Sequence, residues 1–273
     1  MDTVKESPEA MSHPVGNVVS AATNRGKDPR FQFAYEDMRG WIAQADRLGE
    51  VRHVKGASWQ EDIGLAADLV MHSDTAPCVI FDEIPGYPKG HRVLVNFFAG
   101  RRKNMTLGLP LEFNKMELSQ AFLDTYLREL PTLKHEFVES GPVMENVMTG
   151  AEVDVTRFPV PLWHERDGGR YIGTGSFNVT MDPEEKWINA GTYRVMIHDR
   201  QSVGFYISPG KHGRIHREKY RARNEPMPVV IVCGGDPLTF LMSSSEMPYG
   251  VCELAIVGGL RNKPLKVVRG KVT

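Results

Sequence analysis

The sequence predicts an α+β protein, with a small α/β domain ahead of a β-rich domain. Helical apolar periodicity alternates with short β-like runs over roughly residues 31–115. Beyond about Gly150 the apolar runs are short and separated by turn residues, which is typical of strands. Residues 1–30 mix Ser, Asn, Pro, Gly and charges without periodicity and are expected to be a disordered lead-in. The expected domains are therefore 31–115 and 116–273.

Two helices are expected at the start of the first domain. Apolar residues recur with helical spacing after Phe33, and Gly49 can end the first helix. Ser58-Trp-Gln-Glu61 fits a capping box that opens the second helix. The expected inward faces are Met38, Trp41, Ile42, Ala45 and Leu48 in the first helix, and Ile63, Ala66, Ala67 and Val70 in the second.

Two β-like runs and a third helix complete this domain. The runs are Cys78–Phe81 and Arg92–Phe97, and the segment 84–90 between them has the Pro and Gly content of a turn. Strands that alternate with helices predict an α/β arrangement. The third helix is expected near Asn114–Leu127, with Leu118, Ala121, Phe122 and Tyr126 facing inward.

The second domain is expected to be a mostly antiparallel barrel or sandwich with a few helices. Thr156–Trp163 is interrupted by prolines and is expected to be an edge or a loop. Gly213–Asn224 is expected to be one helix, and Asp236-Pro237 can open another, with Asp as the cap and Pro in the first turn. The expected strands are Tyr171–Met181, Asn189–Ile197, Val203–Ile207, Val229–Cys233 and Leu265–Arg269.

Composition and charge argue against several classes of protein. With 33 basic and 34 acidic side chains the net charge is −1, so no global field draws the chain to nucleic acid or to an acidic membrane. The basic stretch Arg101-Arg-Lys103 and the basic residues within 214–223 fit solvated helix faces better than a nucleic-acid surface. The apolar runs are far shorter than the roughly 20 residues that span a bilayer. Three scattered cysteines and a polar start without a signal peptide indicate a cytoplasmic protein.

Asn189-Ala-Gly-Thr-Tyr-Arg194 is the first of three motifs that carry chemistry. Gly191 would allow close backbone approach to a ligand, although a plain strand that passes close to another segment is the alternative. Asn189 and Arg194 are five residues apart, so a regular strand points them to opposite faces. If both touch one ligand, the ligand wraps around the strand end or the strand bulges at Gly191.

The second motif is Ser208-Pro-Gly-Lys-His212-Gly, between an expected strand and an expected helix. The free N–H groups of a first helical turn attract anions, and Lys211 adds a charge suited to phosphate. An ordinary surface loop is the alternative. His216 follows His212 at metal-binding spacing, but there is no HExxH pattern, and His216 is expected to be an exposed helix residue.

The third motif is Cys252-Glu253-Leu, where Glu253 precedes the apolar run 254–257, expected to be a strand. A carboxylate buried there needs a metal or an arginine as a partner, whereas a solvent-facing glutamate needs neither. The Asn189 amide oxygen, the His212 imidazole and the Glu253 carboxylate would together suit Mn²⁺ or Mg²⁺ better than a soft thiolate site would. A cation held there could bridge the protein to a phosphate.

Together these segments resemble the UbiD family of prenylated-FMN-dependent decarboxylases, over about Phe33 to Thr273. The Lys-His form of the second motif is similar to the aromatic-acid branch. The resemblance implies that the second domain is a flavin-binding split β-barrel, incomplete at its C-terminus. The motifs that carry it are Asp167-Gly-Gly-Arg-Tyr-Ile172, Asn189-x-Gly-x-Tyr-Arg194, Tyr206-Ile-x-Pro-Gly-Lys-His212, Gly235-Asp-Pro237 and Glu253-Leu-Ala-Ile-Val-Gly258.

The resemblance also implies roles for individual residues. Asn189, His212 and Glu253 match metal ligands that hold Mn²⁺ or Mg²⁺, with K⁺ nearby, against the flavin phosphate. Residues 243–245 fall where the family often places potassium and phosphate contacts. Arg194 and Glu253 receive catalytic roles, and Arg194 matches the arginine of a Glu-Arg-Glu network that can hold the substrate carboxylate. The implied cofactor-binding residues are Asn189, Ala190, Gly191, Thr192, Tyr193, Arg194, Lys211, His212 and Glu253.

The implied reaction is a reversible, non-oxidative loss of CO₂ from an aromatic or α,β-unsaturated carboxylic acid. The implied partners are that acid, a flavin prenyltransferase that supplies the cofactor, and further copies of the full-length chain in a homo-oligomer. The two glutamates of the network are expected past Thr273, together with a C-terminal domain, so we expect a fragment that binds cofactor weakly and turns over little. A conventional FMN oxidoreductase and a non-catalytic flavin-binding or assembly fragment remain the alternatives.

Overall fold

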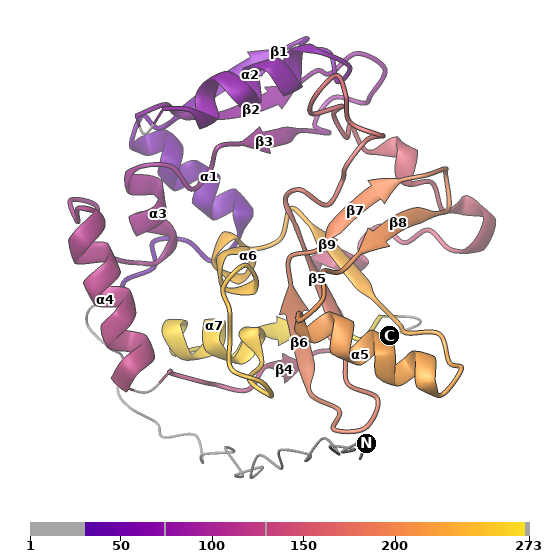
Figure 1. Ribbon diagram of the computed structural model, residues 1–273. Coiled ribbons are helices and arrows are strands. Elements are labelled where there is room, and N and C mark those ends of the chain that lie inside the picture. The colour runs from indigo at the N-terminus through magenta and orange to yellow at the C-terminus, as the bar shows by residue number, and fades with distance from the viewer. Residues whose placement is uncertain (1–30, 74, 129, 271–273) are drawn as a thin grey trace, which may run out of the picture.

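A computed structural model describes residues 31–73, 75–128 and 130–270 of the protein. The architecture is mixed α/β (Figure 1). One small sheet with its helices lies at the top of Figure 1, and the β-rich part lies at the right. The expected disordered lead-in, residues 1–30, falls outside the described residues.

The N-terminal part is a three-stranded sheet of order β1-β2-β3 with short helices around it. β1 and β2 run parallel, and β3 runs antiparallel to β2. Trp41 and Ala45 are buried, as the apolar periodicity predicted, and Asp37 caps the first helix by accepting the Gly40 N–H. The elements are α1 (Met38–Arg47), β1 (Val51–Lys55), α2 (Asp62–Met71), β2 (Cys78–Asp82), β3 (Val93–Val95) and α3 (Arg101–Thr106).

Two expectations for this part need correction. The second helix starts at Asp62, and its entry is held by a reciprocal pair in which the Ser58 N–H donates to the Asp62 carboxylate and the Asp62 N–H donates to Ser58 Oγ. Arg102, expected on a solvated face, is 1% exposed. Its guanidinium pairs with Glu50 and donates to two backbone carbonyls, so it ties α3 to the sheet.

The β-rich part contains three small sheets and no closed barrel among the described residues. In the first sheet β5 pairs antiparallel with both β6 and β9, β7 and β8 form an antiparallel hairpin, and β4 and β10 run parallel. The elements are α4 (Lys115–Arg128), β4 (Glu136–Phe137), η1 (Pro142–Met144), η2 (Gly150–Glu152), η3 (Val155–Arg157), β5 (Ser176–Met181), β6 (Ile188–Gly191), β7 (Arg194–Ile197), β8 (Val203–Tyr206), α5 (His212–Ala222), β9 (Val230–Cys233), α6 (Pro237–Ser243), α7 (Glu253–Arg261) and β10 (Lys266–Val267).

The segment Asn189–Ile197, expected as one strand, is two strands that belong to different sheets. β6 ends at Gly191 and β7 begins at Arg194, so Thr192 and Tyr193 carry the chain from one sheet to the other. The Thr192 N–H donates to the Ser243 carbonyl across 3.1 Å and anchors this crossing to α6. Asn189 and Arg194 therefore lie on separate sheets.

The apolar run 254–257, expected as a strand, forms the first turn of helix α7. A short run of buried apolar residues fits a buried strand and a buried helix equally well, so the pattern could not separate them. Asn262 ends the helix in the left-handed conformation, with a φ of 49°. Glu253 is consequently the first residue of a helix.

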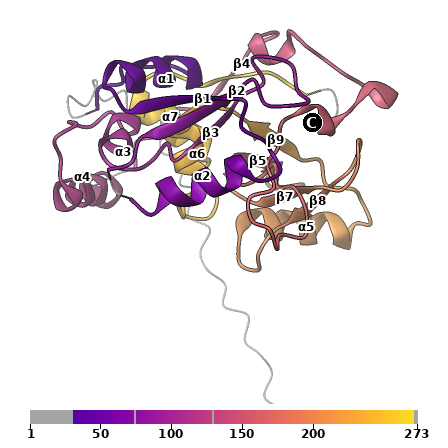
Figure 2. The ribbon, with the colours of Figure 1, turned by 90° about the horizontal axis from the view of Figure 1, so that it is seen from above.

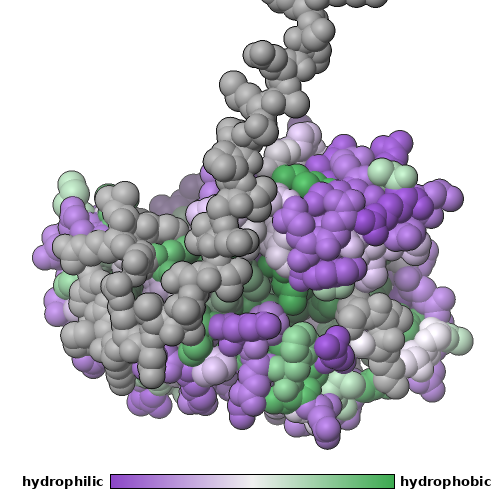
Figure 3. Space-filling view, turned by 90° about the horizontal axis from the view of Figure 1, so that it is seen from below, coloured by the Kyte–Doolittle hydropathy of each residue, from purple (hydrophilic) through white to green (hydrophobic). Residues whose placement is uncertain are grey.

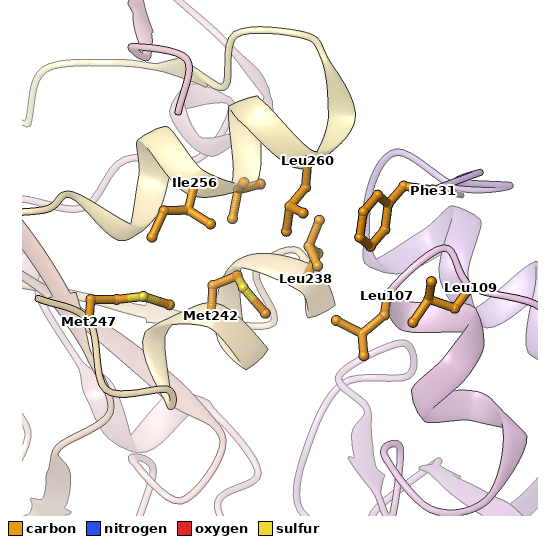
Figure 4. Packing of buried hydrophobic residues seen from close by; sticks show 9 residues of the cluster. Phe31, Leu107, Leu109, Leu238, Met242, Met247, Ile256 and Leu260 are labelled. Atoms are coloured by element: carbon orange, nitrogen blue, oxygen red, sulfur yellow. The ribbon is translucent and has the colours of Figure 1, made fainter. Parts of the chain in front are cut away.

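One hydrophobic core joins the N-terminal part to α6 and α7 (Figure 4). Asp236 caps α6 by accepting the Thr239 N–H across 3.0 Å, with Pro237 at the first turn, as the sequence predicted. Because the same core packs α7, it fixes the position of Glu253 at the start of that helix. The core residues are Phe31, Leu107, Leu109, Leu238, Met242, Met247, Ile256, Val257 and Leu260.

The third expected helix is present as α4, and Leu118, Ala121 and Phe122 pack partly buried against this core; the Tyr126 side chain lies outside the description. Seen from above, α1 lies on the opposite side of the molecule from hairpin β7–β8 and α5 (Figure 2). Hydrophilic residues gather at the upper right of Figure 3, on the side where α5 lies.

No helix within the described ranges has the length and apolar character needed to cross a membrane.

Candidate functional site

Glu253 is a buried carboxylate, 3% exposed, at the N-terminus of α7. Its Oε2 accepts the backbone N–H of Ala190 across 2.8 Å, which joins α7 to β6. Burial raises the pKa of Glu253 to about 7, and the Ala190 N–H offsets only part of that effect. No lysine or arginine of the described ranges forms an ion pair with it, so a bound cation would supply the missing partner.

Asn189 lies one residue before Ala190 and is 2% exposed. Its Nδ2 donates to Tyr193 Oη across 2.9 Å, and the same oxygen accepts the Gly213 N–H across 3.0 Å. Burial raises the pKa of Tyr193, so the phenol is neutral at ordinary pH. Tyr193 thus connects the end of β6 to the first turn of α5.

His212 is the first residue of α5 and is half-buried. Its ring meets Trp187 and Tyr249 edge-on, with centroid distances of 5.2 and 5.9 Å. Burial, and then the neighbouring Lys211 charge, lower the pKa of His212. The neutral imidazole that results is the form that binds a metal.

The three predicted motifs therefore converge on one region. Ala190 bonds to Glu253, and Tyr193 links Asn189 to the residue after His212. Within the described ranges no group of three or more His, Cys, Asp or Glu side chains could hold a metal, so a metal here depends on the Asn189 amide. One amide oxygen, one imidazole and one buried carboxylate without a cationic partner fit an ion of the Mn²⁺ or Mg²⁺ kind.

Gly191 lies against the side chain of Tyr193. A Cβ at this position would lie 2.4 Å from Tyr193 Oη, so the glycine makes room for the tyrosine side chain. Gly213 is similar, because a Cβ there would lie 2.7 Å from the same oxygen. Within the protein, the group that approaches the backbone of both glycines closely is the Tyr193 side chain.

Lys211 is exposed, and its Nζ lies 2.8 Å from Glu246 Oε1. The hydroxyls of Ser243, Ser244 and Ser245 all donate to carbonyls within α6. To donate to a phosphate, these hydroxyls would have to break their hydrogen bonds to the helix carbonyls. Their oxygens can still accept a hydrogen bond or ligate a cation. Lys211 can leave Glu246 for a phosphate at little cost, because an exposed ion pair contributes only about 0–1 kcal/mol.

Arg194 stands apart from this cluster, on the wall of a cavity of about 810 Å³. The side chain is exposed, and its guanidinium carbon lies 5.9 Å from the centre of the Tyr171 ring. The cavity has a volume typical of small-ligand sites and is rich in aromatic side chains. Its aromatic lining is Phe97, Phe158, Trp163, Tyr171, Phe177 and Phe240.

His216, expected to be exposed, is fully buried. Its Nδ1 lies 2.9 Å from Thr180 Oγ1, and its ring packs edge-on against Trp187. Burial lowers the pKa of His216 to about 4, and the nearby Asp182 carboxylate opposes the shift without cancelling it. His216 was predicted to be exposed because most of its neighbours in the sequence are charged, but it lies on the face of α5 that packs inward.

A stripe of buried polar residues along β5 was not predicted from the sequence. Ser176, Asn178 and Thr180 are each no more than 2% exposed. They alternate with Phe177 and Val179, and this period of two was the available signal. Thr180 pairs with Asn189 across the sheet, so the stripe continues into the site.

A family model described as the 3-octaprenyl-4-hydroxybenzoate carboxy-lyase Rift-related domain, UbiD, matches residues 136–273. The chain is 36% identical over 202 residues to a pyrrole-2-carboxylic acid decarboxylase of Pseudomonas aeruginosa. This match covers 71% of this chain and 40% of that protein. It is 30% identical over 247 residues to a phenolic acid decarboxylase of Sedimentibacter hydroxybenzoicus, covering 86% of this chain and 50% of the relative.

Solved structures share the fold. The closed form of the vanillic acid decarboxylase of Sedimentibacter hydroxybenzoicus matches with a TM-score of 0.79 at 27% identity, over 88% of this chain and 51% of that one. The UbiD-class enzyme HmfF of Pelotomaculum thermopropionicum, solved in an evolved dimeric form with prFMN, matches with a TM-score of 0.75 at 21% identity, over 87% and 53%. The chain spans about half the length of the curated relatives it matches.

Proposed function

The chain belongs to the UbiD family, and from this premise we propose that it is the flavin-binding part of a decarboxylase for an aromatic carboxylic acid. The observation that carries the proposal is the convergence of Asn189, His212 and Glu253 from three separate segments, with the buried Glu253 carboxylate in no ion pair among the described residues. Sheet β6-β5-β9 and hairpin β7–β8 serve as the flavin-binding split barrel. An α,β-unsaturated acid is the other substrate class that the family resemblance suggests.

The metal cluster holds the phosphate end of prenylated FMN. Asn189, His212 and Glu253 bind Mn²⁺ or Mg²⁺, and this cation screens the phosphate from the Glu253 carboxylate, which would otherwise repel it. Lys211 leaves its exposed partner Glu246 to face the phosphate, and K⁺ binds near residues 243–245. The backbone from Ala190 to Tyr193 lines the cofactor, because it connects the metal cluster to the strand that carries Arg194.

Arg194 binds the substrate carboxylate at the wall of the aromatic cavity. Among the described residues no acidic side chain is paired with its guanidinium, which is exposed and therefore available to an anion. The cavity supplies apolar surface for the ring of an aromatic acid. The bound prenylated flavin supplies the electron sink for the charge left when CO₂ departs, which no amino acid side chain can provide.

The relatives support the substrate class through the acids in their names, a pyrrole carboxylic acid and phenolic acids. In the full-length protein we also propose a supply of cofactor by a flavin prenyltransferase and assembly into a homo-oligomer. The dimeric form of HmfF supports the second of these.

The proposed function is tested by reconstitution. The purified chain is mixed with Mn²⁺ and prenylated FMN, passed over a desalting column and examined by absorbance, and CO₂ release is then measured with pyrrole-2-carboxylate and with a phenolic acid. Retained modified flavin supports the proposed flavin-binding part, and CO₂ release from either acid, at the low turnover expected of a fragment, supports the proposed substrate class. Ordinary FMN with NAD(P)H consumption would support an oxidoreductase instead, and a colourless protein would support a non-catalytic assembly fragment.

A further inference from the structure

A row of buried polar side chains begins at Asn189, and apart from Asn189 its members have no part in the function proposed above. It runs from Asn189 through Thr180 and His216 to Asp182, and these four side chains are each no more than 2% exposed. Lys219 closes the row at its far end, with its Nζ 2.6 Å from Asp182 Oδ2. Buried polar groups are costly unless they are bonded, so the arrangement calls for a structural or functional reason.

The Asn189 amide is held at both of its N–H groups. Nδ2 donates to Tyr193 Oη across 2.9 Å and to Thr180 Oγ1 across 3.3 Å. An amide nitrogen has two protons, and these two bonds use both of them. The Asn189 carbonyl oxygen consequently faces away from Thr180 and Tyr193 and is left as the group that can meet a cation.

The direction of the next hydrogen bond follows from the first. Thr180 Oγ1 accepts from Asn189, so its own single proton is free to be donated to His216 Nδ1, 2.9 Å away. His216 then carries its proton on Nε2, which has no hydrogen-bond partner among the described residues and lies 3.9 Å from Asp182 Oδ2. Asp182 is fixed by Lys219 and by the backbone N–H groups of residues 184 and 185.

We propose that Thr180 and His216 form a positioning relay that fixes the Asn189 amide with its oxygen toward the cation site. The relay rests on the proposed function, since it names the residues that prepare one of the proposed ligands. Without the Thr180 acceptor the amide can rotate and turn its NH₂ group toward the cation, which repels it. Loss of a partner behind a metal ligand typically lowers metal affinity about 10–100-fold.

The first test measures Mn²⁺ affinity in the presence of FMN, from the electron paramagnetic resonance signal of free Mn²⁺. Thr180→Val removes the hydroxyl at nearly constant volume and is expected to weaken Mn²⁺ binding about 10–100-fold. Thr180→Ser keeps the hydroxyl and is expected to restore affinity to within about threefold of the original protein, as retention of the same hydrogen bonds predicts.

The matched control is Thr125→Val. Thr125 is also buried, but its hydroxyl donates only to the Ala121 carbonyl of its own helix, so Mn²⁺ affinity should not change. Unchanged Mn²⁺ affinity in Thr180→Val, or equal losses in Thr180→Val and Thr180→Ser, would overturn the relay. Circular dichroism confirms that each variant is folded before the titration.

The second test needs neither ligand nor variant. Long-range ¹H–¹⁵N spectra of the ligand-free protein report which ring nitrogen of His216 carries the proton, and the relay predicts Nε2. A proton on Nδ1 would overturn the relay even if Mn²⁺ binds as proposed. If the original protein binds no Mn²⁺ with FMN, the proposed function fails while this spectrum still decides the hydrogen-bond direction, so the two failures are distinguishable.

Discussion

The Ala190 N–H donates to Glu253 Oε2 across 2.8 Å and joins β6 to the first turn of α7. These two residues are 63 positions apart in the chain. The bond brings the carboxylate next to the strand that carries Asn189, while burial leaves it with a raised pKa. A carboxylate held in this way, with no cationic side chain paired to it in the described part of the chain, is the central feature of the site.

The first prediction concerns pH and the ligand-free protein. The pKa of Glu253 is raised by burial from 4.5 to about 7, so the folded state binds the proton more tightly than the unfolded state. Stability from this group is therefore fully present below about pH 4.5 and is lost as pH rises toward 7, by about 3 kcal/mol at most. Glu253→Gln should flatten this part of the stability profile, measured by urea unfolding between pH 5 and pH 8. A profile with the same slope as the original protein would contradict the assignment.

The second prediction concerns Tyr193. Tyr193→Phe leaves the Asn189 amide and the Gly213 N–H without their shared acceptor, so the free energy of unfolding should fall by about 1–3 kcal/mol. Tyr206→Phe is the matched control, because that side chain is 58% exposed and its loss should change stability by no more than about 0.5 kcal/mol. Equal effects of the two substitutions would count against the described hydrogen bonds.

The third prediction concerns the space beside Gly191. A Cβ there would lie 2.4 Å from Tyr193 Oη, so Gly191→Ala should displace the tyrosine and cost about 1–3 kcal/mol. Gly175→Ala is the control, because a Cβ at that position meets no atom within 4 Å. Thermal unfolding of both variants checks the prediction. A Gly191→Ala protein as stable as Gly175→Ala would show that the tyrosine does not fill this space.

The fourth prediction compares two arginines that share one partner. Arg102 is 1% exposed and Arg101 is exposed, and both pair with Glu50. Arg102→Ala should destabilise the protein by about 3–5 kcal/mol, because it removes a buried pair and leaves carbonyls without donors. Arg101→Ala should cost about 0–1 kcal/mol. Urea unfolding that ranks the two substitutions in the opposite order would refute this description of α3.

Much of the architecture could be predicted from local signals. The apolar period of 38–48 predicted α1, and Asp236-Pro237 predicted the start of α6. The run 254–257 was assigned wrongly because four consecutive apolar residues do not reveal whether their period is helical. β1 was not predicted, because only Val51 of its five residues is buried and it lies at the sheet edge.

For the candidate site, too, some features could be predicted from the sequence and others could not. Its residue types could be chosen from the sequence because an amide, an imidazole and a carboxylate in ordered motifs carry a chemical meaning. His216 and Arg102 could not be assigned correctly, because their burial depends on distant segments that cover them, namely Trp187 with Thr180 and the sheet with Glu50. Contacts between distant segments, and not local composition, decide which charged or polar side chains are buried.

The most direct test of the central claim is Mn²⁺ binding, measured in the presence of FMN, for the original protein and for Asn189→Ala, His212→Ala and Glu253→Gln. The exposed His53→Ala serves as the control for loss of an imidazole elsewhere. The account predicts one bound Mn²⁺ per chain, at least about a tenfold loss of affinity in each of the three site variants and no loss in the control. Undiminished affinity in all three site variants would contradict it.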